Sequence, residues 1–190
     1  MLRFDPSQAR SFGPDLRALR KSRGVTLSRM AERLGRSVGW LSQVERDLSA
    51  PSVADLGQIA AALDVPLSLL LGPAGGAPEE AGHVVRRDAR RPVGPKVAGL
   101  AEELLSPDLT DDFEVVHSTF APHSRLKQTV TRPTQEVGYV VSGALDLVIG
   151  GRSFTVREGD SFRIRGEPFR WSNPNDTPAV AIWVIAPPVY

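Results

Sequence analysis

The chain has 190 residues, a length expected for one or two domains, and 23 Lys and Arg residues nearly balance 22 Asp and Glu residues. It contains no cysteine, which excludes disulfide bonds and thiol catalysis. Hydrophobic residues make up 41% of the chain, and no apolar run approaches the ~20 residues that cross a membrane. No secretory signal pattern is evident, so we expect a cytoplasmic protein without a membrane partner.

The net charge of +1 conceals an uneven distribution. Residues 1–72 carry 10 Lys and Arg against 7 Asp and Glu, whereas residues 73–190 carry 13 against 15. Within residues 10–46 the count is 9 basic against 3 acidic. Such a basic stretch suits a surface that faces nucleic-acid phosphates, although an ordinary solvated face gives the same count.

The first elements are a flexible arm, residues 1–13, and a helix from Pro14 to Arg23. Leu16 and Leu19 are predicted to face the core of this helical region. The basic residues of the helix are predicted to face solvent or phosphate: Arg17, Arg20, Lys21 and Arg23.

Two short helices around a tight turn are predicted next. The hydroxyl of Thr26 can cap the first of them, whose apolar residues recur at helical spacing: Leu27, Met30, Ala31 and Leu34. Gly35 follows where a left-handed residue ends the helix. Ser37 caps the second helix, which runs to about Arg46 and turns three residues inward: Trp40, Leu41 and Val44.

This pattern is that of a helix-turn-helix whose second helix enters a DNA groove. Residues Leu16 to Leu71 resemble the Cro/repressor-like (XRE-type) helix-turn-helix domain, with LRALRKSRG, LSQVER and PSVADLGQIAAALDV at the expected spacings. The resemblance implies a five-helix, lambda-repressor-like DNA-binding domain over residues 14–72, with a fourth helix opened by Pro51 and Ser52 and a fifth from Leu67 to Leu71. It also implies these DNA contacts: Thr26, Arg36, Ser37, Val38, Gly39, Ser42, Gln43 and Arg46. The alternative is a small helical bundle that docks protein.

A linker rich in glycine and proline is predicted over residues 73–82. Beyond it, short β-branched or aromatic runs separated by turn residues predict an all-β barrel or sandwich. Gly150 and Gly151 read as a hairpin turn. The predicted strands are Val84-Val85, Phe113 to Val116, Val137 to Val141, Ala144 to Ile149, Phe154 to Val156, Phe162 to Ile164 and Val180 to Ile185.

Residues 83–190, with a core at 110–188, resemble a cupin domain, a jelly-roll barrel also called a double-stranded β-helix. Glu136 and Gly143 fit the end of the first cupin motif, and Gly159-Asp160 opens the second, which closes near Pro168 to Asn173. The whole chain therefore resembles an α + β, two-domain regulator with a cupin behind its helix-turn-helix.

The chain departs from metal-binding cupins at the ligand positions. The resemblance places two histidines among residues 129–132 and a third at 169 or 170, but this chain has none there. Only Glu136 remains, so we expect no metal, no cofactor and no catalytic residue. His117 and His123 are interpreted as an ordinary strand histidine and loop histidine.

A small-molecule site is predicted in the barrel from Arg132, Glu136, Tyr139, Phe169 and Arg170. Inward arginines suit a carboxylate, phosphate or sulfate ligand, whereas outward arginines only solubilise the surface. Strand alternation allows either orientation. If Phe162 and Ile164 pack inward, Arg163 and Arg165 point outward.

These observations together predict a sequence-specific regulator that is not an enzyme. Its partners are expected to be double-stranded DNA with a near-palindromic operator, a second copy of the chain in a homodimer, and a small-molecule effector. Two alternatives stay open. The barrel is a ligand-free dimerisation module, or it is a metal-dependent enzyme of the epoxidase kind.

Overall fold

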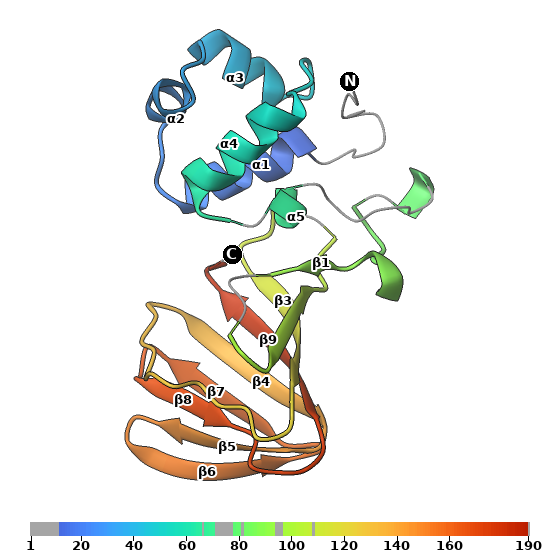
Figure 1. Cartoon of the computed structure of the whole chain (residues 1–190), viewed down its shortest axis with the longest axis vertical. Coiled ribbons are helices and arrows are strands. Elements are labelled where there is room, and N and C mark those ends of the chain that lie inside the picture. The colour runs from blue at the N-terminus through green and yellow to red at the C-terminus, as the bar shows by residue number, and fades with distance from the viewer. Residues whose placement is uncertain are drawn as a thin grey trace. The chain divides into compact units, whose positions relative to one another are not determined.

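The computed structural model describes residues 12–65, 67–70, 78–80, 82–93, 97–107 and 109–189. The chain divides into two compact units, one built on the N-terminal helices and one on the C-terminal strands (Figure 1). Residues 1–11 of the expected arm and 73–77 of the expected linker lie outside the described residues. Helices followed by β-strands are the order that the sequence predicts.

The helical unit contains four helices of seven residues or more in its described part, and α5 is a single turn of four residues. The expected fifth helix is therefore reduced to one turn. The elements of this unit are α1 (Phe12–Ser22), α2 (Leu27–Arg33), α3 (Val38–Val44), α4 (Val53–Leu63), α5 (Leu67–Leu70), the 3₁₀ turns η2 (Pro78–Glu80) and η3 (Arg87–Ala89), and β1 (Arg91–Pro92).

The core of the helical unit is made by the apolar stripes of these helices. Leu16, Met30 and Leu41 are completely buried, as is Ile59 of α4. Each comes from a position that helical periodicity turns inward, so the predicted stripes of α1, α2, α3 and α4 meet in one core. Leu27, expected in the same stripe, is only half-buried.

Helix α1 begins two residues earlier than the sequence predicts. Phe12 is 2% exposed, and the backbone N–H of Gly13 donates to Oδ1 of Asp47 at 2.7 Å. Residues 12 and 13 therefore belong to the packed helix and not to a flexible arm. The apolar side chain of Phe12 buries against the unit, which outweighs the weak helix propensity of the glycine that follows.

The boundary between the units lies later than the predicted linker. Described residues 78–93 group with the helices, as do the described residues of segment 106–111. The cause is a buried ion pair: Nη1 of Arg91 donates to Oδ2 of Asp15 at 2.8 Å, and both side chains are at most 2% exposed. The other carboxylate oxygen of Asp15 accepts the N–H of Leu109 at 2.9 Å. This division differs from the boundary expected at residue 83, and the contacts of Asp15 are consistent with it.

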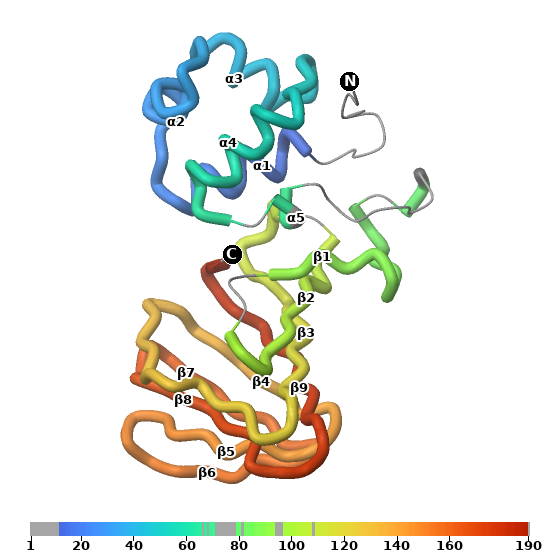
Figure 2. Tube along the Cα trace, viewed as in Figure 1, coloured from blue at the N-terminus to red at the C-terminus, as the bar shows by residue number. Residues whose placement is uncertain are grey.

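The barrel unit consists of two antiparallel sheets. In one sheet the strands run in the order β2-β3-β9-β4-β7, and in the other β6-β5-β8 (Figure 2). The strands are β2 (Leu100–Leu104), β3 (Glu114–Phe120), β4 (Gln135–Ser142), β5 (Ala144–Ile149), β6 (Arg152–Arg157), β7 (Ser161–Arg165), β8 (Phe169–Ser172) and β9 (Ala179–Ala186).

Six of the seven predicted strands are present, and the one predicted at Val84-Val85 is absent. Val84-Val85 lies in irregular structure between η2 and η3. The sequence did not predict β2 or β8. The hairpin at Gly150 and Gly151 joins β5 to β6, and both glycines have positive φ, as a type I′ turn requires.

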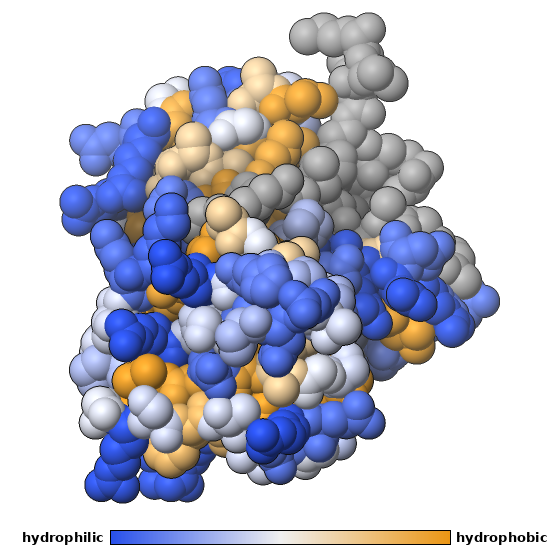
Figure 3. Space-filling model, turned by 60° about the horizontal axis from the view of Figure 1, so that its bottom comes forward, coloured by the Kyte–Doolittle hydropathy of each residue, from blue (hydrophilic) through white to orange (hydrophobic). Residues whose placement is uncertain are grey.

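The barrel core lies between the two sheets. Its aromatic residues meet edge to face: Phe120 and Trp171 have centroids 4.7 Å apart, and Phe162 and Trp183 are 4.9 Å apart. Asn173 is completely buried, and its side-chain amide donates to three backbone carbonyls, among them that of Thr177 at 2.9 Å. The outer surface is mixed, with apolar patches among hydrophilic ones (Figure 3).

Candidate functional site

The turn between α2 and α3 is held by side-chain caps at both helix starts. The hydroxyl of Thr26 accepts the N–H of Arg29 at 3.2 Å, and that of Ser37 accepts the N–H of Trp40 at 3.1 Å. Gly35 has φ +60, so the left-handed residue lies where the sequence predicts it. The caps orient both hydroxyls at the surface, where each can still donate a hydrogen bond outward.

Helix α3 has one face buried in the core and one face free. Leu41 and Val44 are completely buried, which fixes the rotation of the helix about its axis. Val38 is 44% exposed, and Gly39 and Gln43 are also exposed. Ser42, also predicted to contact DNA, is half-buried, as is Trp40 on the opposite side. The structure thus brings four of the expected base-reading positions onto one helix: Val38, Gly39, Ser42 and Gln43.

The two arginines predicted to contact phosphate, Arg36 and Arg46, differ in how far their guanidinium groups are already engaged in contacts within the protein. Arg36 pairs with Asp55 at 2.6 Å and lies 5.2 Å from the ring centroid of Trp40, so its guanidinium already has a structural role. Arg46 lies just beyond the end of α3, and its Nε donates to the carbonyl of Ser42 at 3.0 Å. Its remaining N–H groups stay available at an exposed position.

Asp55 is the residue that links Arg36 to the start of α4. Burial alone would raise the pKa of Asp55, but hydrogen bonds from Ser52 and Arg36 hold that pKa below its ordinary value. Ser52 and Asp55 form a capping box, in which each side chain accepts the backbone N–H of the other residue. The carboxylate therefore stays charged and keeps the guanidinium of Arg36 in place.

Arg20 is not at the surface, contrary to the prediction. Its Nε donates to Oε1 of Glu45 at 2.5 Å and its Nη2 to Oε2 at 2.8 Å, with both residues buried. The hydrogen bond to Glu45 raises the pKa of Arg20. This bidentate pair joins α1 to the residue that ends α3, so it fixes the candidate reading helix against the domain.

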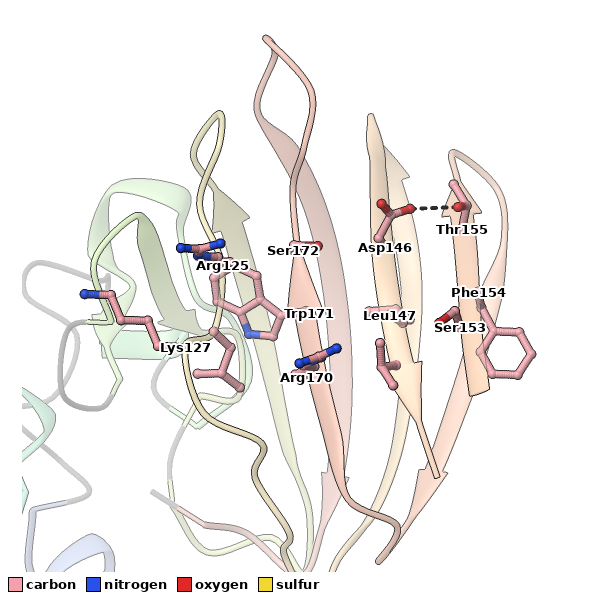
Figure 4. A pocket seen from close by; sticks show the side chains of 12 residues that line it. Arg125, Lys127, Asp146, Leu147, Ser153, Phe154, Thr155, Arg170, Trp171 and Ser172 are labelled. Carbon is pink, nitrogen blue, oxygen red and sulfur yellow. Dashed lines mark hydrogen bonds between the residues drawn. The ribbon is translucent and has the colours of Figure 1, made fainter. Parts of the chain in front are cut away.

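In the barrel, strand alternation decides which predicted ligand residues face inward. Along β4, Glu136, Gly138 and Val140 face the interior, whereas Tyr139 is 49% exposed on the outer face. Along β8, Phe169 is buried and Arg170 is exposed. Tyr139 and Arg170 are therefore not part of an interior site, and Figure 4 shows Arg170 among the residues that line a pocket over β5, β6 and β8.

The remaining three predicted ligand residues come together. Nη1 of Arg132 lies 4.0 Å from Oε1 of Glu136, and its guanidinium carbon is 6.0 Å from the ring centroid of Phe169. The hydroxyl of Thr134 donates to the same carboxylate oxygen of Glu136 at 2.6 Å. Glu136 itself is 1% exposed, so the hydrogen bond from Thr134 and the nearby guanidinium of Arg132 offset the cost of burying its carboxylate.

Sequence reasoning missed two further carboxylates of this region. Glu114 on β3 is 1% exposed, and burial raises its pKa to about 7, although the N–H of Val189 donates to it. Burial also raises the pKa of Glu102, which accepts the hydroxyl of Ser118 at 3.1 Å. Both glutamates lie an even number of positions from apolar residues that face inward on the same strand. This spacing is the signal that could have identified them.

Two polar atoms of the barrel interior lack a hydrogen-bond partner in the described part of the chain. They are Oε2 of Glu114 and Nε1 of Trp183, and both residues are at most 5% exposed. Buried polar atoms in proteins are nearly always paired, so these two are candidates for contact with a ligand.

The side chains present do not fit the metal that many cupins bind. His117 lies on the outward side of β3, with Nδ1 4.0 Å from Oε2 of Glu103, and His123 pairs with Asp176 in a turn. Neither reaches Glu136, and no group of three His, Cys, Asp or Glu suited to a metal ion exists among the described residues. Equally, no helix in the described part is long and apolar enough to cross a membrane.

Two family models match the chain. One, described as a helix-turn-helix domain, matches residues 11–71, and the other, described as a cupin domain, matches residues 116–185. Both lie where the structure has the corresponding fold. The cupin match begins within β3 and therefore leaves out β2 and Glu114.

The chain is similar to two curated regulators over about a third of its length. It is 46% identical over 65 residues to the HTH-type transcriptional regulator SutR of Escherichia coli, covering 34% of this chain and 36% of that protein. It is 41% identical over 63 residues to the transcriptional regulator ClgR of Mycobacterium tuberculosis, covering 33% of this chain and 56% of that protein. The matched segment thus spans about a third to a half of these relatives.

A solved structure is similar over nearly the whole chain. It is an HTH_3 family transcriptional regulator from Vibrio cholerae, 22% identical, with 98% of this chain and 100% of that chain covered and a TM-score of 0.44.

Proposed function

Because the chain belongs to the XRE-type helix-turn-helix proteins that carry a C-terminal cupin domain, we propose that it binds double-stranded DNA sequence-specifically and regulates transcription. One observation carries this proposal. Helix α3 is locked into the core by Leu41 and Val44 while Val38, Gly39 and Gln43 remain free on its outer face. A helix held in this way can lie in the major groove with its outer side chains at base edges.

The contacts divide into reading and positioning groups. The amide of Gln43 can pair with an adenine through two hydrogen bonds, and Val38 can contact a thymine methyl. The hydroxyls of Thr26 and Ser37 and the guanidinium of Arg46 are the phosphate contacts that hold the register. Arg36 supports them indirectly, because its charge is held by Asp55.

The test is selection of bound fragments from sheared genomic DNA by purified protein at about 150 mM salt, where non-specific phosphate attraction is weak. We expect enrichment of a near-palindromic site. Gln43→Ala should broaden the selected sequences, whereas Gln58→Ala, an exposed glutamine on α4, should leave them unchanged. Failure of the folded protein to enrich any sequence would remove the proposal.

We also propose that the protein acts as a homodimer, as a palindromic site requires. The support is the outer face of β4 and β9, where four large apolar side chains are more than 40% exposed: Val137, Tyr139, Val141 and Val184. Exposed apolar patches of this kind mark interfaces. At micromolar concentration, Tyr139→Asp should lower the molecular mass measured by analytical ultracentrifugation. If the unsubstituted protein is already a monomer at that concentration, the dimer is contradicted.

The third element of the proposal is a small-molecule effector near Arg132, Glu136 and Phe169. Of the four arginines that the sequence places near the pocket, only Arg132 faces this region; Arg163 and Arg165 are exposed on β7, and Arg170 on β8. Glu136 lies 4.0 Å from Arg132, and Glu102 and Glu114 also interact with that cation electrostatically, so acidic groups outnumber basic ones here and favour an effector with a positively charged group. A barrel that only dimerises the protein would show no ligand-dependent change in operator affinity.

A further inference from the structure

A groove lies on the outside of the barrel, over the three-stranded sheet β6-β5-β8. Its volume is about 760 Å³, and its walls come from these strands and from residues 125–127 of the preceding segment (Figure 4). That segment extends the sheet, because the N–H of Leu126 donates to the carbonyl of Trp171 at 3.0 Å. The groove thus spans four adjacent chain segments and lies apart from the inward-facing Glu136.

Register places polar side chains in a row across the sheet. Thr155 pairs with Asp146, Asp146 with Ser172, and Ser172 with Arg125. The four therefore line up across the groove, as Figure 4 shows. In the next row Arg170 pairs with Val148 on the same face. Lys127, two residues after Arg125, also lines the groove.

Three cations therefore share one groove: Arg125, Lys127 and Arg170. In the part of the chain that the structure describes, none of them forms an ion pair, whereas other arginines of this chain do, such as Arg20 with Glu45. Cations on neighbouring strands repel one another. The one carboxylate of the groove, Asp146, accepts the hydroxyl of Thr155 at 2.7 Å. The arrangement leaves two positive charges in excess.

We propose that this groove binds a small organic dianion, with a phosphate monoester as the ligand class that fits it. Two guanidinium forks and an ammonium group match a dianionic phosphate, and the hydroxyl of Ser172 can donate a further hydrogen bond. The volume of the groove is that of a small-molecule site, so inorganic phosphate alone would leave much of it unfilled and an organic group beside the phosphate would fit. Leu126 and Val148 supply apolar wall beside the cations.

The experiment uses the full chain and isothermal titration calorimetry at pH 8 and about 50 mM salt, so that electrostatic attraction is only partly screened. The probes are phenyl phosphate, a dianion at this pH; benzenesulfonate, a monoanion with the same ring; and inorganic phosphate. We expect phenyl phosphate to bind at least ~10-fold more tightly than either of the others, with affinity that falls as salt is added.

Four variants locate the binding and separate it from a general charge effect. Arg170→Gln and Arg125→Gln should each weaken phenyl phosphate binding by ~10-fold or more, because each removes a charged fork. Arg152→Gln, which removes an exposed cation of β6 outside the groove, should change affinity less than ~2-fold. Asp146→Asn should tighten binding several-fold, a gain that a purely structural role of Asp146 does not produce.

Three results would overturn the inference. They are equal affinity for the mono- and dianionic probes, equal loss in Arg152→Gln and Arg170→Gln, and tight binding of inorganic phosphate that the phenyl group does not improve. Fragment selection is run on the same variants. If Arg170→Gln abolishes operator binding while phenyl phosphate does not bind, the groove cations contact DNA, and the small-ligand site is refuted while the DNA-binding proposal stands.

Discussion

Breaking the ion pair between Asp15 and Arg91 by removing one partner is predicted to cost the helical unit several kcal/mol of stability. Both side chains are at most 2% exposed, and the pair is 2.8 Å long. Nη1 of Arg91 also donates to the carbonyl of Leu69, and its Nη2 to that of Pro107. Asp15→Asn keeps the shape and the oxygen that accepts the N–H of Leu109, but it leaves the guanidinium charge buried without a counter-ion.

Removing one partner of a buried pair costs about 3–5 kcal/mol, because the other charge stays desolvated. We therefore expect Asp15→Asn to lower the free energy of unfolding by that amount. Arg91→Met leaves a carboxylate that can take up a proton, so its cost should be smaller at pH 5 than at pH 8. The cost of Asp15→Asn should change much less over the same range.

The assay is urea unfolding followed by far-UV circular dichroism, which reports mainly on the helices. The matched control is Arg36→Gln, which breaks a pair whose arginine side chain is 48% exposed. Solvent screens this exposed guanidinium, and Asp55 keeps its hydrogen bonds with Ser52, so the change should cost only about 0–1 kcal/mol. If Asp15→Asn costs no more than Arg36→Gln, the pair is not desolvated, and the reasoning that places residues 91 and 109 in the helical unit is wrong.

Three further predictions concern helix α3, the glycines of α1 and α4, and the barrel. Gln43→Ala should weaken operator binding by about 1–3 kcal/mol and relax base preference, measured by competition with mismatched sites; unchanged selectivity would exclude Gln43 as a reader. Gly13→Ala should destabilise the protein by about 1–3 kcal/mol, since its Cβ would lie 2.7 Å from the carbonyl oxygen of Val44, whereas Gly57→Ala on α4 has open space and should stabilise by about 0.5–1 kcal/mol. The pKa of Glu114 is raised from 4.5 to about 7, so the contribution of this group to stability is fully present below pH 4.5 and falls by about 3 kcal/mol as pH rises to 7; Glu114→Gln should remove that part of the pH dependence in urea unfolding.

The helix-turn-helix is predictable from sequence because its determinants are local. Thr26 and Ser37 cap helices that begin at the next residue, and Gly35 ends one of them, so each signal lies within a turn of the feature it controls. The apolar spacing of α3 correctly assigns Leu41 and Val44 to the core. Nothing beyond about 20 residues is needed to recognise this arrangement.

The ion pairs of buried charged residues could not be predicted from local sequence patterns. Arg17 and Arg20 read alike in the sequence, yet Arg17 is exposed and Arg20 is buried against Glu45, 25 positions away. Arg91 finds Asp15 across 76 positions. A periodic pattern shows which face a cation occupies but not whether a distant carboxylate will meet it there, because that depends on how the helices pack.

The barrel strands were predicted where alternation is strong and missed where composition opposes it. Residues 100–104, LAEEL, are good helix formers, yet they pair with β3 as β2. Cross-strand pairing outweighs helix propensity here, since propensity amounts to only a few tenths of a kcal/mol per residue. Residues 169–172, FRWS, follow a glycine and a proline, residue types frequent in turns, and were not predicted as a strand.

Alternation predicts which residues share a face without showing which face is inside. The conditional prediction for β7 is confirmed, because Ile164 is buried and Arg163 and Arg165 are exposed. The same logic corrects two ligand assignments. Tyr139 differs by an odd number of positions from Glu136, and Arg170 is adjacent to Phe169, so neither pair can share a face of its strand.

Glu136 occupies a position that resembles a metal-ligand position of cupins, but its neighbours in this chain are not metal ligands. In metal-binding cupins this position supplies a ligand, but here the neighbouring positions hold threonine, valine and arginine. Its carboxylate instead accepts the hydroxyl of Thr134 at 2.6 Å and lies 4.0 Å from the guanidinium of Arg132. A hydroxyl donor and a cation can stabilise a buried carboxylate without a metal ion. The fold therefore accounts for where Glu136 points, and the side chains around it determine what it does.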